Sequence, residues 1–145
     1  MNPMQGLNVI WVFNRTADKA LFCKRRKEPY KGLYNLVGGK IEPNEDGLTA
    51  SYRELREETG IEDIKLVHLM DFTYYEHPHN SIFFTNSCRV EVYFGKLNTD
   101  VEVSGDENDL MWLDISENFF DISRFAGEGN IGHIYEIIKQ NFLFK

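Results

Sequence analysis

The chain has 145 residues, enough for one domain with a single packed core. Hydrophobic residues make up 42% and charged residues 27%, which excludes a disordered chain, and no apolar run approaches the roughly 18 residues of a membrane span. The net charge of −7 argues against a nucleic-acid polymer as partner, because such binding uses many Lys and Arg contacts to phosphate. It leaves room for a small anionic ligand held by a local basic patch or by a metal.

Hydrophobic patterning predicts short strands separated by turns. The first two strands are joined by a polar turn and suggest a hairpin, and a loop with Pro29 and Gly32 follows them. A short strand then leads into Gly38 and Gly39, and an acidic loop over residues 98–108 precedes the last strand. The strands are expected at residues 9–13, 20–24, 34–37, 64–75, 82–97 and 110–115.

Two segments have the spacing of amphipathic helices that lie on a sheet. The first covers about residues 46–59, where Asn44 can cap the start and Gly60 the end. Its predicted apolar stripe consists of Leu48, Tyr52, Leu55 and Thr59. The second covers about residues 131–142. Its predicted buried face consists of Ile131, Ile134, Tyr135, Ile138 and Phe142.

Three carboxylates share one face of the first predicted helix. Glu54, Glu57 and Glu58 have the spacing i, i+3, i+4, which places their side chains side by side. Their repulsion would destabilise the helix or raise their pKa values unless a cation lies between them. Mg²⁺ prefers carboxylate oxygens and keeps waters or substrate phosphates in its shell, so it fits this pattern. A solvated acidic face without a ligand is the other interpretation.

The residues around these glutamates follow a longer pattern. Residues 39–61 read G-x5-E-x7-R-E-U-x-E-E-x-G-U, in which U is a bulky aliphatic residue. At every fixed position this is similar to the signature of the Nudix hydrolases, and the surrounding strands and late helix extend the resemblance to residues 1–145. The resemblance implies one α+β domain in which a mixed β-sheet is sandwiched between helices (α/β/α).

The same resemblance implies a reaction and its residues. Nudix hydrolases use Mg²⁺, which Mn²⁺ can replace, to hydrolyse a nucleoside diphosphate linked to another group, by attack of water on phosphorus. The implied metal ligands are the carbonyl of Gly38 and the carboxylates of Glu54, Glu57 and Glu58. Arg53 and Glu45 resemble the supporting ion pair that orients the glutamates. Alternatively, Arg53 forms only a surface ion pair worth under about 1 kcal/mol.

A further acidic residue is expected from a loop. Glu107 lies five residues before Trp112 and resembles the metal-binding or base glutamate of the sanitising triphosphatases in this family. Asp106 and Asp109 are nearby competitors for that role. An exposed acidic turn without a catalytic role is the other reading of this segment.

Residues 24–40 carry six basic residues against one acidic residue, although the whole chain is acidic. A basic patch beside a metal-binding helix suits a triphosphate, so Lys24, Arg25 and Lys40 are candidate phosphate ligands. The pattern does not decide which of Lys24 and Arg25 points inward. A solvated basic loop without a ligand is the other interpretation.

Two asparagines are candidate readers of a nucleobase. Residues 32–40 resemble the MutT-type branch, the 8-oxo-dGTP diphosphatases, and Asn35 follows an aromatic residue before the double glycine as in that branch. Residues 125–130 resemble the segment of bacterial MutT that ends in its base-contacting Asn, here Asn130. Alternatively, Asn35 satisfies backbone groups and Asn130 caps the helix that follows it. Val37 departs from the Pro of bacterial MutT.

The sequence therefore predicts an enzyme that hydrolyses a nucleoside triphosphate to nucleoside monophosphate and pyrophosphate, sanitising oxidised purine nucleotides such as 8-oxo-dGTP. Hydrolysis of ADP-ribose, a dinucleoside polyphosphate or another nucleotide-linked diphosphate is the alternative, and a catalytically silent nucleotide-binding module is a second one. The expected partner is a nucleotide, with no nucleic-acid polymer and no membrane, while monomer and homodimer both stay open. Two isolated cysteines, Cys23 and Cys88, and no recognisable secretion signal predict a cytoplasmic protein.

Overall fold

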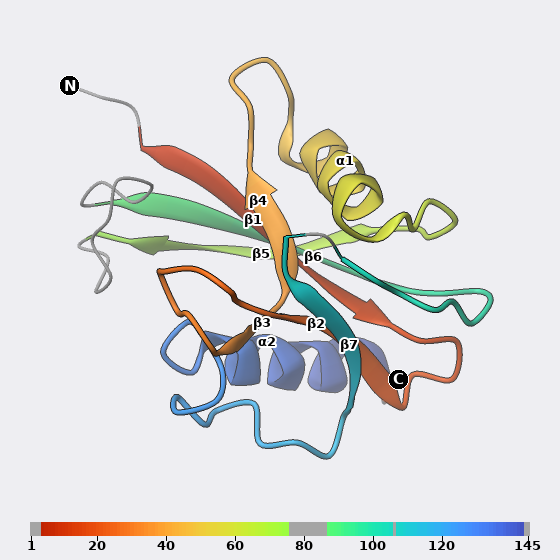
Figure 1. Cartoon of the computed structure of the whole chain (residues 1–145). Helices are drawn as coiled ribbons and strands as arrows, with labels where there is room; N and C mark the ends of the chain where they lie inside the picture. Colours follow the sequence, from red (N-terminus) through yellow and green to blue (C-terminus); the bar gives the residue numbers. More distant parts are fainter. Residues whose placement is uncertain (1–3, 76–86, 106, 144–145) are drawn as a thin grey trace.

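The structure is a computed structural model that describes residues 4–75, 87–105 and 107–143. In this part of the chain, two helices cover opposite faces of a mixed sheet of seven strands (Figure 1). The predicted α+β architecture is confirmed. None of the described helices is long and apolar enough to cross a membrane. In chain order the elements are β1 (Gln5–Phe13), β2 (Lys19–Lys24), β3 (Tyr34–Asn35), β4 (Val37–Lys40), α1 (Gly47–Thr59), β5 (Val67–Tyr74), β6 (Cys88–Lys96), β7 (Asp109–Asp114), α2 (Asn130–Ile138) and a π-helical turn (Lys139–Leu143).

Strand β1 is the centre of the sheet. One of its edges pairs in parallel with β6, which in turn pairs with β5. Its other edge pairs antiparallel with β4 from Leu7 to Ile10 and meets β2 only at Phe13 and Ala20. The expected hairpin of β1 and β2 is therefore short, because β4 occupies most of that edge. Strand β2 also pairs with β3 and β7.

Side chains of β1 alternate between two hydrophobic cores, as the period of a strand requires. Ile10 and Val12 face α1 and pack with Leu55, and all three are fully buried. Trp11 faces α2 and stacks on Tyr135, with ring centroids 5.0 Å apart. The sheet thus has no solvated face along β1, and both helices are held by apolar burial.

Helix α1 begins at Gly47 and is capped by Asp46, so the expectation that Asn44 caps it is wrong. The Asp46 side chain accepts a hydrogen bond from the Thr49 backbone N–H at 2.7 Å. Gly60 ends the helix as expected, in a left-handed conformation with φ of 78°. Asn44 lies two residues before the cap, too far from the first turn to reach its N–H groups.

The buried face of α1 differs from the predicted stripe. Its buried residues are Gly47, Ala50, Ser51 and Leu55. Leu48, expected in the stripe, is 41% exposed. A Cβ atom at Gly47 would come within 1.9 Å of a carboxylate oxygen of Glu91 on β6. Small residues therefore let the helix lie close to the sheet, and the bulky Leu48 is turned outward.

Helix α2 also departs from its predicted form. It ends at Ile138, and the wider turn that follows leaves Phe142 49% exposed, although it was expected on the buried face. Asn130 is the first residue of the helix rather than its cap. Gly129 takes the cap position, with φ of 90°, and no side chain caps the helix there. The Asn130 amide instead donates to the hydroxyl of Tyr74.

Several predicted strands have different bounds, and β1 begins at Gln5, four residues before its expected start. The expected strand 34–37 is divided at Leu36, which is buried, because β3 pairs with β2 whereas β4 pairs with β1. The strands expected over 64–75 and 82–97 are shorter, as β5 and β6. Residues 82–86 of the second one lie outside the described part of the chain.

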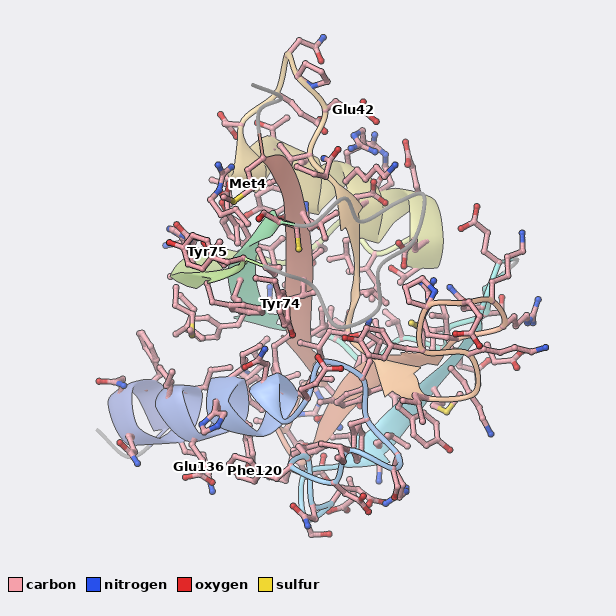
Figure 2. The ribbon with its side chains drawn as sticks, turned by 90° about the vertical axis from the view of Figure 1, so that its left-hand side faces the viewer. Met4, Glu42, Tyr74, Tyr75, Phe120 and Glu136 are labelled. Atoms are coloured by element: carbon pink, nitrogen blue, oxygen red, sulfur yellow. The ribbon has the colours of Figure 1, made fainter. Side chains whose placement is uncertain are left out.

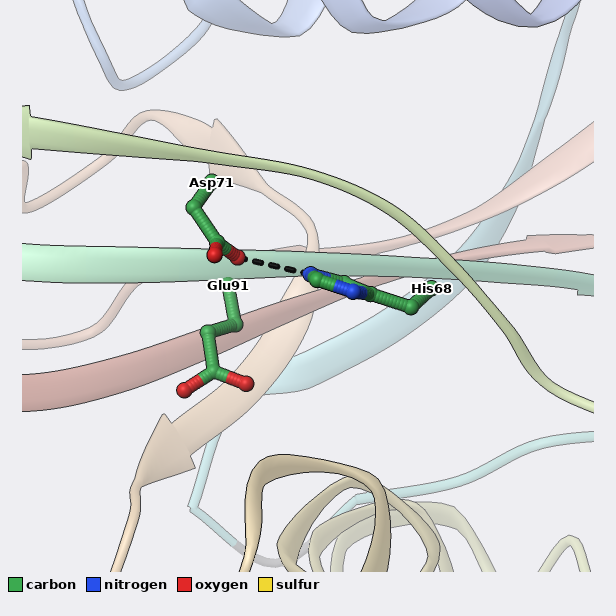
Figure 3. Close-up of side chains that lie close together, drawn as sticks. All are labelled: His68, Asp71 and Glu91. Atoms are coloured by element: carbon green, nitrogen blue, oxygen red, sulfur yellow. Dashed lines mark hydrogen bonds and ion pairs between the residues drawn. The ribbon is translucent and has the colours of Figure 1, made fainter.

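A polar cluster on β5 and β6 lies beside the start of α1. A β-bulge in β5 brings His68 and Asp71 to one face, where their side chains lie 2.7 Å apart beside Glu91 (Figure 3). Both oxygens of Glu91 accept hydrogen bonds, one from the Tyr93 hydroxyl at 2.7 Å and one from Arg89 at 2.9 Å. We interpret this cluster as structural, because its best-buried carboxylate already has a donor on each oxygen.

The cap assignment predicts the effect of two neighbouring substitutions. Asp46→Ala removes the acceptor of the Thr49 N–H, so we expect the free energy of unfolding to fall by about 1 kcal/mol. Asn44→Ala should change it by less than about 0.5 kcal/mol. Urea denaturation of both variants measures the difference, and an equal loss in the two would contradict the cap.

Candidate active site

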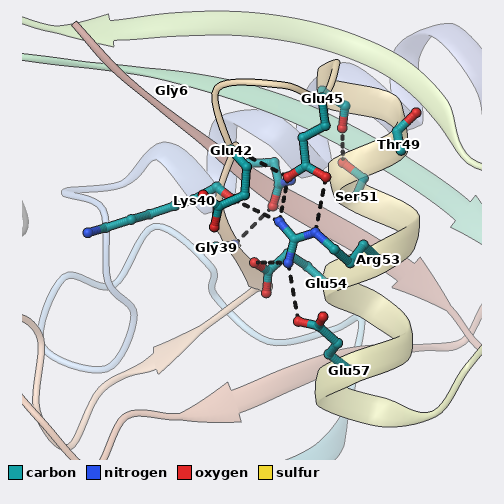
Figure 4. A network of polar contacts seen from close by, with 12 residues as sticks. Gly6, Gly39, Lys40, Glu42, Glu45, Thr49, Ser51, Arg53, Glu54 and Glu57 are labelled. Carbon is teal, nitrogen blue, oxygen red and sulfur yellow. Dashed lines mark hydrogen bonds and ion pairs between the residues drawn. The ribbon is translucent and has the colours of Figure 1, made fainter.

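Arg53 is the centre of a polar network between α1, the segment before it and the end of β4 (Figure 4). Its guanidinium donates to both carboxylate oxygens of Glu45, with Nε 3.0 Å from Oε2. It also donates to Glu54 at 3.0 Å and to Glu57 at 3.2 Å. A further bond, 3.2 Å long, reaches the backbone carbonyl of Lys40 on β4. One planar cation therefore ties the segment before α1, the end of β4 and two glutamates into one arrangement.

The glutamates of α1 share a cleft of about 480 Å³ with a residue from the opposite loop. This acidic cleft is lined by Glu54, Glu57, Glu58 and Glu107, among others. Burial, together with the charges of Glu54 and Glu107, raises the pKa of Glu58 to about 8. Burial also raises the pKa of Glu54, although the bond from Arg53 opposes this. The protein alone thus resists full ionisation of the cluster, which a bound cation would relieve.

The double glycine lets the backbone of β4 pass close to α1 and β1. A Cβ atom at Gly39 would lie 2.6 Å from the carboxylate carbon of Glu54. One at Gly38 would lie 2.1 Å from the backbone oxygen of Asn8 on β1. A side chain at Gly38 would push β4 away from the backbone of β1, and one at Gly39 would displace the Glu54 carboxylate. The geometry therefore requires both glycines at this point of the sheet.

Asn8 is a residue of this region that the sequence patterns did not single out. It is 2% exposed, and its side-chain oxygen accepts the Gly39 N–H at 2.9 Å. Its Nδ2 has no hydrogen-bond partner within the described residues. In the sequence, Asn8 is the one polar residue within the apolar stretch 7–13. Because a buried amide usually forms a hydrogen bond, this position could have indicated a bonded side chain. Asn8 thus fixes the backbone of the double glycine beside Glu54.

The basic residues of the loop do not all face the glutamates. A central cleft of about 300 Å³ is lined by Arg25, Glu54 and Glu58, among others. A larger basic cleft of about 760 Å³ is lined by Arg25 and Lys40 together with Arg26 and Lys27. Lys24 lines neither of them, and its ammonium lies 5.6 Å from the ring centroid of Tyr34. The sequence left open which of Lys24 and Arg25 points inward. In the structure Arg25 lines both clefts.

The two candidate base readers lie at different places. Asn35 lines the central cleft, the basic cleft and an apolar cavity of about 90 Å³, so it lies where the three meet. Its side-chain oxygen accepts the backbone N–H of Leu36 at 2.8 Å. Asn130 lines the apolar cavity together with Tyr74. Asn35 therefore shares a cleft with the carboxylates of Glu54 and Glu58, whereas Asn130 lines the apolar cavity and not that cleft.

Among the acidic residues considered for the additional role, Glu107 faces the glutamates. It lines the acidic and the central clefts. Asp109 forms an ion pair with Arg26 instead. Asp106 lies outside the described residues. This geometry favours Glu107 over Asp109 as the additional acid.

Comparison with known proteins identifies the family. The family model of the NUDIX domain matches residues 4–132, which is most of the chain. The chain belongs to the NUDIX family. The family resemblance based on residues 39–61 is confirmed, and the clefts described above are those of a NUDIX domain.

Individual relatives of this NUDIX domain differ in what they act on. The RNA pyrophosphohydrolase of Pelagibacter ubique (strain HTCC1062) is 38% identical over 79 residues, which are 54% of this chain and 49% of that protein. The match thus spans about half the length of that relative. The E. coli dihydroneopterin triphosphate pyrophosphohydrolase superposes with a TM-score of 0.74 at 15% identity, covering 99% of this chain and 100% of that one.

A bifunctional NMN adenylyltransferase/ADP ribose pyrophosphatase from Francisella tularensis, complexed with AMP and a Mn ion, gives a TM-score of 0.70 at 22% identity. The match covers 97% of this chain and 42% of that one. At such identities these structures show a shared fold, and the substrate has to be argued from the residues of this chain.

Burial of Glu58 makes the stability of the metal-free protein depend on pH. Its pKa rises from an ordinary 4.5 to about 8, so the folded protein binds this proton more tightly than the unfolded chain. The stabilisation is complete below about pH 4.5 and is lost as the pH rises through about 8. In EDTA, we expect Glu58→Gln to exceed the wild type in stability by on the order of 2 kcal/mol at pH 9, with little difference at pH 4.

Glu57→Gln is the matched control for this measurement. Its side chain is 56% exposed, so neutralising it should change stability by less than about 0.5 kcal/mol at either pH. Urea denaturation in EDTA at pH 4 and pH 9 measures both variants. If the two variants change the free energy of unfolding equally at both pH values, the pH dependence does not come from the burial of Glu58.

Proposed function

We propose that the protein is a Nudix hydrolase that splits a nucleoside triphosphate into nucleoside monophosphate and pyrophosphate, with Mg²⁺ as cofactor and Mn²⁺ as a substitute. The continuity of the clefts carries this proposal. The central cleft shares Glu54 and Glu58 with the acidic cleft and Arg25 with the basic cleft, and through Asn35 it meets the apolar cavity. A metal, a phosphate chain and a base could therefore lie along one path.

The donor set supports a divalent cation. Glu58 is half-buried beside Glu54 and Glu107 with a raised pKa, and Gly39 leaves no side chain between β4 and the Glu54 carboxylate. The carboxylates of Glu54, Glu57 and Glu58 and the carbonyl of Gly38 would hold the ion, since hard cations prefer such oxygens. When bound, Mg²⁺ neutralises phosphate charge and lowers the pKa of water.

Residues of the chain supply orientation and proton transfer. Arg53 fixes the carboxylates of Glu54 and Glu57 and limits their repulsion through its bonds to both. Glu107 faces the same cleft from the opposite loop, and in this proposal it accepts a proton from the water that attacks phosphorus. As the new P–O bond forms, the phosphoanhydride bond breaks and pyrophosphate leaves.

The substrate is proposed from the other clefts. Arg25 and Lys40 in the basic cleft suit the negative charge of a triphosphate chain. Asn35 and Asn130, which line the apolar cavity, can hydrogen-bond the edge of a base held between apolar side chains. Together with the MutT-like pattern of residues 32–40, these features support an oxidised purine nucleotide such as 8-oxo-dGTP.

A second candidate is the 5′ end of an RNA chain. The relative from Pelagibacter ubique, 38% identical over 79 residues, is an RNA pyrophosphohydrolase. The acidic net charge of −7 disfavours a long polyanion, whereas a free nucleotide needs only the local basic cleft. The two substrates share the triphosphate and differ in the chain attached beyond the nucleoside.

A hydrolysis panel tests the proposal. It contains 8-oxo-dGTP, dGTP, the other nucleoside triphosphates, ADP-ribose, diadenosine polyphosphates and a 5′-triphosphorylated RNA oligonucleotide, each with Mg²⁺ and with EDTA. We expect a free purine nucleoside triphosphate to give the highest kcat/KM, with pyrophosphate as product and no turnover in EDTA. Faster hydrolysis of the oligonucleotide would move the assignment to RNA ends.

Two adjacent residues provide a matched pair in the same panel. Arg25→Ala removes a cation from both clefts and should raise KM for nucleoside triphosphates by about 10-fold, the scale of one charged contact. Lys24→Ala removes an equal charge that faces Tyr34 and should change KM by less than about 2-fold. Equal effects would show that phosphate binding reflects general charge rather than the basic cleft.

A further inference from the structure

Four side chains form a hydrogen-bonded network at the apolar cavity. The hydroxyl of Tyr30 donates to the carboxylate of Glu128, at 2.9 and 2.8 Å from its two oxygens. The hydroxyl of Tyr74 lies 3.3 Å from the same carboxylate and 3.2 Å from the Gly127 carbonyl, and it accepts the Asn130 amide at 2.7 Å. Figure 2 shows Tyr74 between the sheet and the start of α2. The network thus joins the loop before β3, the end of β5 and the loop before α2.

Two members of this network have strained backbones. Tyr30 and Glu128 have φ of 65° and 55°, a left-handed conformation that costs a residue with a Cβ atom about 1 kcal/mol or more. Elsewhere among the described residues, the same is true of Ala17, in the turn between β1 and β2. Strained residues are retained where the surrounding structure needs them, and here they are bonded directly to each other beside a cavity.

The network fixes the orientation of the Asn130 amide. Because Tyr74 accepts one N–H of Asn130, its own single proton is directed to Glu128 or to the Gly127 carbonyl. Burial and the charge of Glu128 raise the pKa of Tyr74 to about 12, so the phenol keeps that proton at neutral pH. The amide then has a carbonyl oxygen and a second N–H with which to pair with an adjacent donor and acceptor on a base.

We propose that Glu128 is a positioning residue for nucleobase recognition, because it orients Asn130 through Tyr74 and anchors Tyr30 at the same cavity. This inference rests on the proposed hydrolysis of a nucleoside triphosphate. Tyr30 belongs to the loop that carries Arg25, which donates to the Pro29 carbonyl one residue before Tyr30. That bond lies within the loop and does not involve Glu128, so the phosphate side of the loop does not depend on this carboxylate.

The test compares two variants with the wild type. Glu128→Gly deletes the carboxylate at a backbone position that glycine adopts without strain, so the fold should be preserved. Tyr74→Phe keeps the ring and removes the hydroxyl that Asn130 contacts. In each variant, KM for the best nucleotide should rise by about 10-fold, and kcat should change by less than about 3-fold. Melting temperatures verify that both variants are folded.

Inorganic tripolyphosphate separates base recognition from phosphate binding. It carries no base, so its Ki as a competitive inhibitor should be the same in both variants and in the wild type. Ala17→Gly relieves the same kind of backbone strain at a site away from the cavity. It should alter neither the nucleotide KM nor the Ki of tripolyphosphate. The double variant Tyr74→Phe with Asn130→Ala should show no larger rise in nucleotide KM than the worse single variant. Both changes break the same hydrogen bond, so their effects should not add.

Each outcome decides between the proposals. An unchanged nucleotide KM in folded Glu128→Gly and Tyr74→Phe overturns the role of Glu128 while the hydrolase assignment stands. An equal rise in KM and in the Ki of tripolyphosphate also overturns it, because the effect would then lie at the phosphates. A wild-type protein that hydrolyses no nucleotide with Mg²⁺ overturns the proposed function and this inference with it.

Discussion

Repulsion among the glutamates of α1 is the constraint on which the site depends. Helical spacing forces Glu54, Glu57 and Glu58 onto one face, and Arg53 offsets part of their repulsion by donating to the first two. Glu58 is instead half-buried beside Glu54 and Glu107, with a pKa raised to about 8. The chain therefore holds a carboxylate cluster that it only partly neutralises, which is the arrangement expected where a cation completes the charge balance.

Close approach of backbones makes this arrangement possible. The double glycine of β4 passes between Asn8 of β1 and Glu54 of α1, where added Cβ atoms would collide with both. Gly47 likewise lets α1 begin directly over β6. Because β1 pairs with β4 on one edge and with β6 on the other, only one strand separates the double glycine beside Glu54 from Cys88 and Val90 of β6, which line the apolar cavity. The sheet therefore sets the distance between the two ends of the site.

Features that depend on local spacing could be predicted from the sequence, whereas those that depend on packing could not. The face shared by the glutamates follows from the helix alone. The exposure of Leu48 depends on how closely α1 lies to the sheet, which Gly47 decides through a contact with a strand far along the chain. The position of Asn130 before a predicted helix suggested a cap, but its amide donates to the Tyr74 hydroxyl of β5 instead. The role of Asn8 could not be predicted because its partner, the Gly39 N–H, lies on another strand.

Calorimetric titration with Mg²⁺ tests the central claim, that the carboxylates of α1 form a metal site. The account predicts binding to the wild type, at least about 10-fold weaker binding to Glu58→Gln, and unaltered binding to Glu91→Gln. Glu91 is the control because it also belongs to an acidic cluster, but Tyr93 and Arg89 already donate to its two oxygens. Unweakened binding to Glu58→Gln, or an equal loss in Glu91→Gln, would contradict the account.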